Sequence, residues 1–346
     1  MINDDDNGLI FASMGMFIID ENHYPDSREN DVDIVGGGGP YALAGARIIV
    51  GPKLSNKLSA IIDMGSDFPH SVEDELKQWN TSIFFRSDPH RLTTRGMNIY
   101  DKNGVRHFKY IAPKKRIESS DILGNMALRT SKTIHLLCSF DRCEEIVTKI
   151  LQKVELKPIF IFEPLPDDCK PENLLKLERV LKNIDIFTPN LNEGAELAGF
   201  LKLPKNSAEL EQLASVFKPY LTLKNSGVVL RCGEMGCYIK SQDKSILMPA
   251  YHSDQAQVVD ITGGGNSYCG GFVVGFYLSK GDWLVGGLCG NIASGCIIEK
   301  LGQPSLSLSE SKELWNGLAT QTRFDTYINA NRGLFENFDK SKIDWL

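Results

Sequence analysis

The feature that most constrains the fold is an alternation of short apolar segments with longer amphipathic ones. The apolar segments read TIHLLCS, KPIFIFEP, IDIFTPN and GVVLRCG, and the sequences between them have the periodicity of helices. Strands that are apolar throughout are buried on both faces, as in a parallel sheet that is covered by helices. The sequence therefore predicts an α/β fold with a mainly parallel central sheet.

The chain is predicted to form one domain over residues 8–320, because no linker, repeat or low-complexity tract divides it. Two alternating runs at 95–111 surround Asn103-Gly104, a dipeptide typical of tight hairpin turns. Together with residues 21–35, this hairpin predicts a small β excursion beside the sheet.

The two ends of the domain carry weaker signals. Residues 8–20 (GLIFASMGMFIID) are predicted as one strand that closes on Asp20. A carboxylate at that strand end can bind substrate hydroxyls, and the alternative is a turn residue. Residues 307–319 are predicted as a helix, and residues 321–346 show no clear pattern.

Net charge and hydropathy exclude several classes of partner. The formal net charge of −6 gives no general attraction to nucleic acid or to anionic lipid. The basic run Lys114-Lys115-Arg116 is predicted to be a solvated loop. No apolar run approaches the length of a membrane span, and the acidic N-terminus is unlike a secretory or mitochondrial leader. We therefore expect a cytoplasmic protein that binds neither nucleic acid nor membrane, with the nucleus as an alternative location.

The eight cysteines show no C-x-x-C pair, and most lie in apolar stretches. Disulfides need an oxidising compartment, which nothing in the sequence indicates. We expect buried, reduced thiols and assign no directly ligated metal.

The segment VVDITGGGNSYCGG (258–271) is predicted to be a strand ending at Asp260, a glycine turn and a small-residue helix that begins near Asn266. Backbone amides at such a turn, aimed along a helix axis, can stabilise the charge of a transferred phosphoryl group. The glycines of the turn are Gly263, Gly264 and Gly265. Asp260 and Thr262 can hold a cation or pin the loop. The alternative is a connection that needs glycines for steric reasons alone.

A second motif, TPNLNEGAEL, places Asn190 and Glu193 three residues apart where a strand meets a helix. An amide and a carboxylate so placed suit a hydrated Mg²⁺ ion with its phosphates. The alternative is a capping box, in which each side chain bonds the other residue's backbone amide.

Two further motifs suggest a nucleotide. VVLRCGEMGCYI brings Arg231, Gly233 and Gly236 to a tight turn that a nucleotide can approach, although a plain hairpin would look the same. Asn291 lies in a helix of small residues, where it can face a ligand. Small residues in a helix also serve close packing.

Four glycines precede a predicted helix in DIVGGGGPYALAGAR (33–47). A dinucleotide-binding G-x-G-x-x-G loop matches poorly, because Tyr41 stands at the third glycine position and the next strand-ending acid, Asp63, comes late. No G-K-[ST] follows, which excludes a Walker-type phosphate loop.

Taken in order, these motifs resemble those of the ribokinase-like PfkB carbohydrate kinases over about residues 10–310. GGGGPYALAGAR together with TGGGN is similar to the family's fungal maintenance-of-killer branch. The resemblance implies a ribokinase-like α/β/α sandwich with a small β lid, and ATP with Mg²⁺ as cofactors. Whether a monovalent cation also binds stays open. The implied reaction is phosphorylation of a hydroxyl on a sugar or nucleoside.

The resemblance also implies roles for individual residues. The positions that match the family's sugar contacts are Asp20, Gly37, Gly38, Gly39 and Tyr41. Those implied to order magnesium and phosphates are Asn190 and Glu193, and those implied to lie by the nucleotide are Arg231, Gly233, Gly236 and Asn291. The backbone amides of residues 263–266 would form the anion hole.

Two departures from the family pattern bear on activity. Tyr41 stands where the family has a sugar-binding asparagine, and Asn266 stands where it has the aspartate that takes the proton from the attacking hydroxyl. An amide can orient a hydroxyl but cannot act as a base near neutral pH. We therefore expect weak or lost phosphotransfer. The alternative is a non-catalytic module that senses a nucleotide or sugar and acts through protein partners; a homodimer also stays open. An acid that reaches Asn266 from elsewhere, such as Asp20 or Glu193, would bear on this choice.

Overall fold

The computed structural model describes residues 8–26, 29–100 and 106–346. Within them, nine strands form a central sheet that is parallel except for β12 and β13 at one edge. In spatial order the strands are β13 (Ser245–Met248), β12 (Cys237–Ser241), β11 (Gly227–Arg231), β10 (Ile186–Phe187), β9 (Ile159–Pro164), β8 (Thr133–Cys138), β1 (Phe11–Ser13), β4 (Leu58–Met64) and β5 (Phe84–Ser87).

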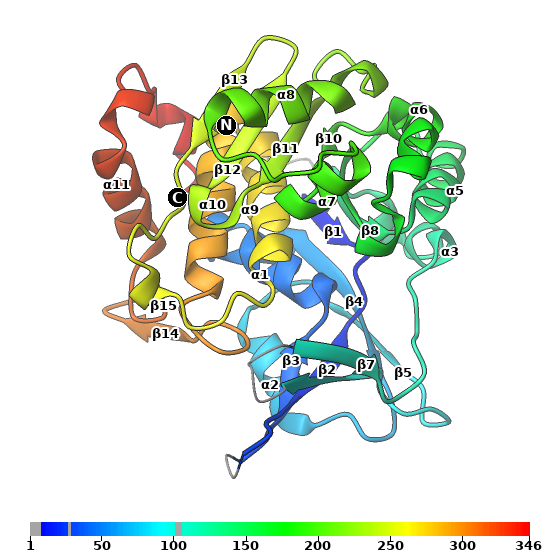
Figure 1. Cartoon of the computed structure of the whole chain (residues 1–346). Coiled ribbons are helices and arrows are strands. Elements are labelled where there is room, and N and C mark those ends of the chain that lie inside the picture. The colour runs from blue at the N-terminus through cyan, green and yellow to red at the C-terminus, as the bar shows by residue number, and fades with distance from the viewer. Residues whose placement is uncertain (1–7, 27–28, 101–105) are drawn as a thin grey trace.

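Helices cover both faces of this sheet, so the fold has three layers (Figure 1), and each face has its own apolar core. The helices of one face are α1 (Gly38–Val50), α2 (His70–Gln78), α9 (Gly264–Leu278), α10 (Trp283–Ile297) and α11 (Thr320–Ala330). Those of the other are α3 (Ser119–Leu123), α4 (Met126–Arg129), α5 (Phe140–Leu151), α6 (Leu177–Val180), α7 (Leu191–Leu197) and α8 (Ser207–Phe217). The predicted α/β/α sandwich is confirmed.

A second, four-stranded sheet lies at one end of the molecule (Figure 1). Its strands are, in order, β3 (Asp31–Gly36), β2 (Ile18–His23), β6 (Arg95–Tyr100) and β7 (Arg106–Tyr110). These strands form the small β lid expected from the sequence. The predicted Asn103-Gly104 turn lies outside the described residues, but β6 and β7 on either side of it pair antiparallel.

The prediction of a single strand over residues 8–20 is wrong, because the chain changes sheets within this segment. β1 belongs to the central sheet and β2 to the lid. The chain passes Gly15 between them, where a Cβ atom would lie 2.4 Å from the backbone nitrogen of Gly39. Asp20 consequently lies in the middle of lid strand β2, with Gly36 and Gly96 packed against its carboxylate.

Close packing of two helices positions the future site. A Cβ atom at Gly270 of α9 would lie 1.8 Å from the carbonyl oxygen of Ala42 in α1, and one at Gly45 would lie 2.1 Å from that of Ser267. The small residues of both helices therefore let the two backbones touch. This contact brings the N-terminus of α1, after the first glycine run, close to the N-terminus of α9, after the second.

The C-terminal region also differs from its prediction. Residues 307–319 were expected to be helical but form most of a hairpin of β14 (Leu306–Ser309) and β15 (Lys312–Trp315). Glu310 and Ser311 turn the chain with positive φ angles of 49° and 65°, which ends any helix there. The chain beyond the hairpin is mostly helical, and Phe324, Tyr327 and Phe335 are buried in the main core.

Other expectations can be compared directly with the structure. No strand precedes the second glycine loop, because Val259 is largely exposed and residues 258–263 are irregular. All eight cysteines are free and buried. Among the described residues, no helix is both long and apolar enough to cross a bilayer.

Candidate functional site

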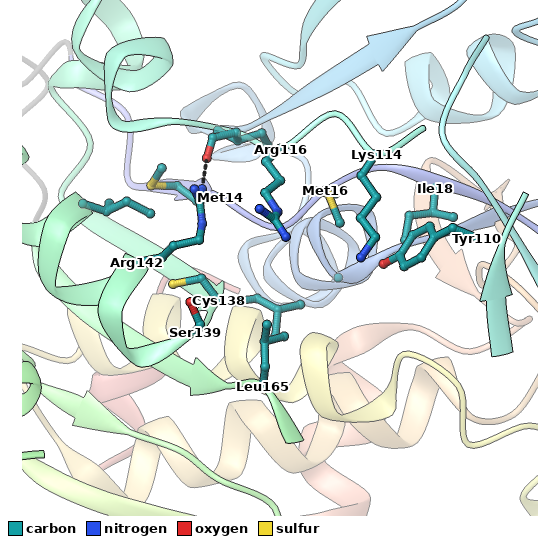
Figure 2. A pocket seen from close by; sticks show the side chains of 14 residues that line it. Met14, Met16, Ile18, Tyr110, Lys114, Arg116, Cys138, Ser139, Arg142 and Leu165 are labelled. Carbon is teal, nitrogen blue, oxygen red and sulfur yellow. Dashed lines mark hydrogen bonds between the residues drawn. The ribbon is translucent and has the colours of Figure 1, made fainter. Parts of the chain in front are cut away.

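Two cavities flank the N-terminus of α9. The strand-end cavity, of about 480 Å³, opens beyond the carboxyl ends of β10 and β11 and has Gly264 and Gly265 in its wall. The lid-side cavity, of about 220 Å³, lies between the lid and the start of α5 and has Gly38 in its wall (Figure 2). Of the predicted nucleotide and phosphate residues, those that line the strand-end cavity are Asn190, Arg231, Gly233, Gly236 and Asn291.

Asn266 lies between wall residues of the two cavities, although it lines neither of them. It is the third residue of α9, directly after Gly264 and Gly265. A Cβ atom at Gly38 would lie 3.2 Å from Nδ2 of Asn266 and 2.2 Å from Cδ2 of Leu137, and both Gly38 and Leu137 line the lid-side cavity. The two glycine runs that the sequence separates by more than 200 residues therefore meet at Asn266.

The side chain of Asn266 is bonded to a buried carboxylate. Its Nδ2 donates to Oε2 of Glu163 at 2.8 Å. The same oxygen lies 3.2 Å from Nε2 of His135 and 3.6 Å from Sγ of Cys269, while Oε1 lies 2.7 Å from Nη1 of Arg231. Neither Asp20 nor Glu193, the acids considered from the sequence, makes this contact. The acid that reaches Asn266 is Glu163.

The electrostatics of this cluster fix its protonation. Burial by itself raises the pKa of Glu163, but the Arg231 cation and the hydrogen bonds from His135 and Asn266 hold that pKa down at about 2. An ionised carboxylate can only accept hydrogen bonds, so Nε2 of His135 must carry a proton and the Asn266 amide must point its NH₂ group at Glu163. The amide oxygen of Asn266 is thereby turned away from Glu163.

Arg231 holds a positive charge beneath the glycine turn. Its Nε and Nη2 donate to the carbonyl oxygen of Thr188 at 3.2 and 3.1 Å, and Nη2 lies 3.5 Å from Oε2 of Glu193. A Cβ atom at Gly265 would lie 2.0 Å from Nη1, so only glycine leaves room for the guanidinium there. The charge of Arg231 is compensated by Glu163 and Glu193, and the Gly264 amide donates to the carbonyl oxygen of Ile261 at 3.2 Å. The groups that favour an anion at this place are therefore the next amides at the start of α9, those of Gly265 and Asn266.

We expect Gly265→Ala to displace Arg231 and to lower the free energy of unfolding by about 1–3 kcal/mol, the usual cost of overpacking. Urea denaturation would measure the loss. Gly333→Ala is the matched control, because no atom lies within 4 Å of a Cβ built there. Equal stability of the two variants would show that Arg231 does not need the space at Gly265.

Asn190 and Glu193 form the capping box that the sequence left as an alternative to a magnesium site. Asn190 Oδ1 accepts from the Glu193 backbone at 2.9 Å, and Glu193 Oε2 accepts from the Asn190 backbone at 2.7 Å. Burial raises the pKa of Glu193 despite the opposing effect of Arg231. Oε1 of Glu193 makes no hydrogen bond with the described residues, so one carboxylate oxygen remains for the water shell of a hydrated cation.

The turn at Gly233 and Gly236 forms another part of the strand-end cavity. Both residues have positive φ angles, of 57° and 86°, and a Cβ atom at Gly236 would lie 2.0 Å from the carbonyl oxygen of Met248. Asn291 Nδ2 donates to the carbonyl oxygen of Pro249 at 3.0 Å and to the Tyr327 hydroxyl at 2.9 Å. Because Tyr327 lies on α11, the C-terminal region contacts the wall of this cavity.

The remaining predicted residues support the loops. Asp260 Oδ1 accepts from the backbone and the hydroxyl of Thr262 at 3.0 and 2.8 Å, which pins the loop. Tyr41 is buried, and a Cβ atom at Gly263, where φ is 77°, would lie 2.2 Å from its ring. Neither Tyr41 nor Asp20 is in the wall of the lid-side cavity, and neither are Gly37 and Gly39. Of the residues matching the family's sugar contacts, only Gly38 lines it.

Sequence reasoning missed Glu163 and His135. Both lie on neighbouring parallel strands, β9 and β8, near the edge where ligands collect in α/β folds. The signal was present for Glu163, a lone carboxylate at the end of the apolar run FIFEP. The sequence signal for His135 was weaker, because a histidine inside an apolar strand is most often a core residue whose hydrogen bonds are satisfied. With Cys269 these residues could in principle ligate a metal, but Arg231 and Asn266 already bond the carboxylate.

Comparison with known proteins identifies the family of the chain. Residues 12–306 match the pfkB family of carbohydrate kinases. The chain is 36% identical to the protein MAK32 of Saccharomyces cerevisiae, over 96% of each chain, and 33% identical to an uncharacterised protein of Schizosaccharomyces pombe, over 92% of each. An Arabidopsis thaliana ribokinase, solved with ribose and ATP, superposes with a TM-score of 0.65 at 16% identity, covering 86% of this chain and 94% of the ribokinase. The chain therefore belongs to the pfkB family of carbohydrate kinases.

Proposed function

We propose that the chain binds ATP with Mg²⁺ in the strand-end cavity and a hydroxyl compound in the lid-side cavity, with weak or lost phosphotransfer between them. The observation that carries the proposal is that Asn266 follows Gly264 and Gly265 of the strand-end cavity, lies beside Gly38 of the lid-side cavity and is hydrogen-bonded to Glu163. Of the predicted nucleotide and phosphate residues, all but Glu193 line the strand-end cavity, while the residue at the position of the base is an amide.

The reasons for weak transfer are chemical. The Asn266 amide can accept a hydrogen bond from a hydroxyl but cannot take up its proton. Glu163, the acid in contact with it, accepts from Arg231, His135 and Asn266, and its pKa is held at about 2. A carboxylate so strongly stabilised as an anion is a poor base. Losing a general base lowers the rate about 10²–10⁴-fold, but positioning and electrostatics still assist phosphoryl transfer.

Several groups favour nucleotide binding. The amides of Gly265 and Asn266 at the positive end of the α9 dipole would bind phosphates. Asn190 and the free oxygen of Glu193 would hold the water shell of Mg²⁺, whose charge would offset that of the transferred phosphoryl group. The Arabidopsis ribokinase of the same fold, solved with ribose and ATP, supports assigning a nucleotide and a hydroxyl compound to the two cavities.

The second candidate is a non-catalytic module that senses a nucleotide or sugar. The favouring observation is the bond between Asn291, in the cavity wall, and Tyr327, on the C-terminal helix α11. A ligand that moves Asn291 would act on α11, which packs beside a hairpin at the edge of the molecule (Figure 1). Protein partners would then respond to whether the cavity holds a ligand.

We expect Mg·ADP and Mg·ATP to raise the melting temperature of the full chain. A ligand at a hundred times its Kd stabilises the folded state by about 2.7 kcal/mol, which differential scanning fluorimetry detects easily. Adenosine is the matched control, since it lacks the phosphates that the α9 amides would bind, and its shift should be smaller. The proposal would be wrong if no purine nucleotide at millimolar concentration changed the melting temperature.

A further inference from the structure

The basic run predicted to be a solvated loop contributes to the wall of the lid-side cavity. Lys114 and Arg116 lie in the exposed loop between β7 and α3, and both line the cavity. Figure 2 shows the Arg116 guanidinium pointing from the loop toward the space above Leu165, and the Lys114 nitrogen beside Tyr110. Lys115, which lies between them in sequence, is not part of the cavity wall. The loop is solvated, as expected, but two of its three cations face a cavity.

These two cations have no acidic counterpart within residues 8–26, 29–100 and 106–346. A third cation of the wall, Arg142 of α5, is neutralised by Glu118, because its Nη1 lies 3.1 Å from both carboxylate oxygens. Lys114 Nζ lies 4.1 Å from the centre of the Tyr110 ring. Among the described residues, no acid pairs with Lys114 or Arg116. The cavity therefore keeps a surplus of positive charge.

The remaining wall is poorly suited to a neutral sugar. Its neutral polar side chains, thiols aside, belong to Tyr110 and Ser139, and Ser139 begins α5 without making a side-chain cap. The other side chains are apolar or sulfur-containing, namely Met14, Met16, Ile18, Ile117, Leu137, Cys138, Ile146 and Leu165. Each sugar hydroxyl that is buried without a partner weakens binding. Asp20, the expected partner of such hydroxyls, packs instead against two lid glycines.

We propose that the ligand of the lid-side cavity carries an anionic group, a phosphate or a carboxylate, that Arg116 and Lys114 bind. The apolar wall lowers the local dielectric and strengthens this attraction. A volume of about 220 Å³ is below the usual range of pockets for drug-sized ligands, about 300–1,000 Å³, so the ligand is small. The anion would lie at the loop, with a hydroxyl toward Gly38 and Asn266. That this ligand is a phosphoryl acceptor rests on the function proposed above, whereas the anion site itself does not.

The test compares small anions with neutral compounds of the same skeleton. The probes are ribose 5-phosphate against ribose, gluconate against glucose, and inorganic phosphate alone. Melting temperature is measured for the full chain across a concentration series of each probe, with Mg·ADP present in excess so that phosphates cannot act through the strand-end cavity. Arg116→Ala and Lys114→Ala are compared with Lys115→Ala, which removes the same charge from the same loop outside the cavity.

We expect at least one anion to stabilise the protein more than its neutral counterpart. Arg116→Ala should weaken that binding roughly tenfold or more, the value of a lost charge-assisted hydrogen bond, while Lys115→Ala should leave it nearly unchanged. Ribose 5-phosphate and gluconate then distinguish a phosphate from a carboxylate. The proposal is overturned if neutral compounds bind as well as their anions, if no anion stabilises the protein, or if Arg116→Ala and Lys115→Ala behave alike. A missing effect of Mg·ADP would count against the proposed function and not against the anion site, which the three variants report by themselves.

Discussion

Exchanging the two contacting groups, by Asn266→Asp together with Glu163→Gln, is expected to raise phosphotransfer about 10²–10⁴-fold, the usual contribution of a general base. The exchange puts a carboxylate between wall residues of the two cavities and an amide in the buried position. Arg231 would then contact an amide at position 163. The carboxylate introduced at position 266 would therefore be stabilised less strongly as an anion than Glu163 is in the wild type. A base with a pKa closer to neutrality accepts a proton more readily.

Asn266→Asp alone should gain less. It would place a second carboxylate at the 2.8 Å contact that the amide now makes with Glu163. Two carboxylates so close share a proton, and the pKa of one of them rises strongly. Because Arg231 and His135 stabilise the charge of Glu163, the proton would reside on the introduced group. The activity of this single variant should therefore rise with pH as that proton is lost, while the double variant should already be active at neutral pH.

The measurement is ATP turnover with those hydroxyl compounds that raise the melting temperature of the wild type. The variants to compare are the wild type, Asn266→Ala, Asn266→Asp, Glu163→Gln and the double variant. A wild type that already turns over at a normal kinase rate, unaffected by Asn266→Ala, would refute the assignment of Asn266 to the position of the base. No activity in any variant, despite ATP binding, would favour the non-catalytic module.

Elements whose signal is local could be predicted from the sequence. The strands β8, β9 and β11 and helix α5 are uniform or strongly periodic, and the structure has them where the sequence indicates. The helix predicted for residues 307–319 is wrong because Leu306 and Leu308 alternate with serines before the turn at residues 310–311, which is a period-two strand pattern. The single strand predicted for residues 8–20 is wrong because the change of sheet depends on a contact between Gly15 and Gly39. Sequence periodicity does not indicate such a contact.

In the candidate site, too, residues with a local sequence motif could be predicted, whereas contacts between distant segments could not. The glycine turns and Asn190 could be found because each has a motif at a fixed spacing. Glu163 could be placed at a strand end, but its contact with Asn266 depends on how α9 packs over β9, which the sequence does not reveal. The place of Arg116 in a cavity wall could not be predicted for a related reason, since a short basic run has the same pattern whether or not a cavity lies beneath it.

Glu163→Gln is expected to lower the free energy of unfolding by about 3 kcal/mol at neutral pH, because it leaves the Arg231 cation buried without its main partner. The pKa of Glu163 leads to a similar value for this free energy. It is about 2 in the folded protein against an ordinary 4.5, so ionised Glu163 stabilises the fold by about 3 kcal/mol above pH 4.5. This stabilisation is lost as the pH falls from about 4.5 through 2. The wild type should therefore lose stability across that window, and the difference between wild type and variant should shrink there.

Urea denaturation at several pH values measures both effects. Glu145→Gln is the matched control, because it breaks an ion pair with Lys149 in which both side chains are about half exposed, and such pairs contribute about 0.2–1 kcal/mol. Adding Asn266→Asp to Glu163→Gln returns one negative charge to the same cluster, so the double variant should recover part of the lost stability. If Glu163→Gln costs no more than Glu145→Gln, the buried pair does not stabilise the fold. If the double variant is less stable than Glu163→Gln, the charge at position 266 does not reach Arg231, and any gain in turnover must then come from proton transfer alone.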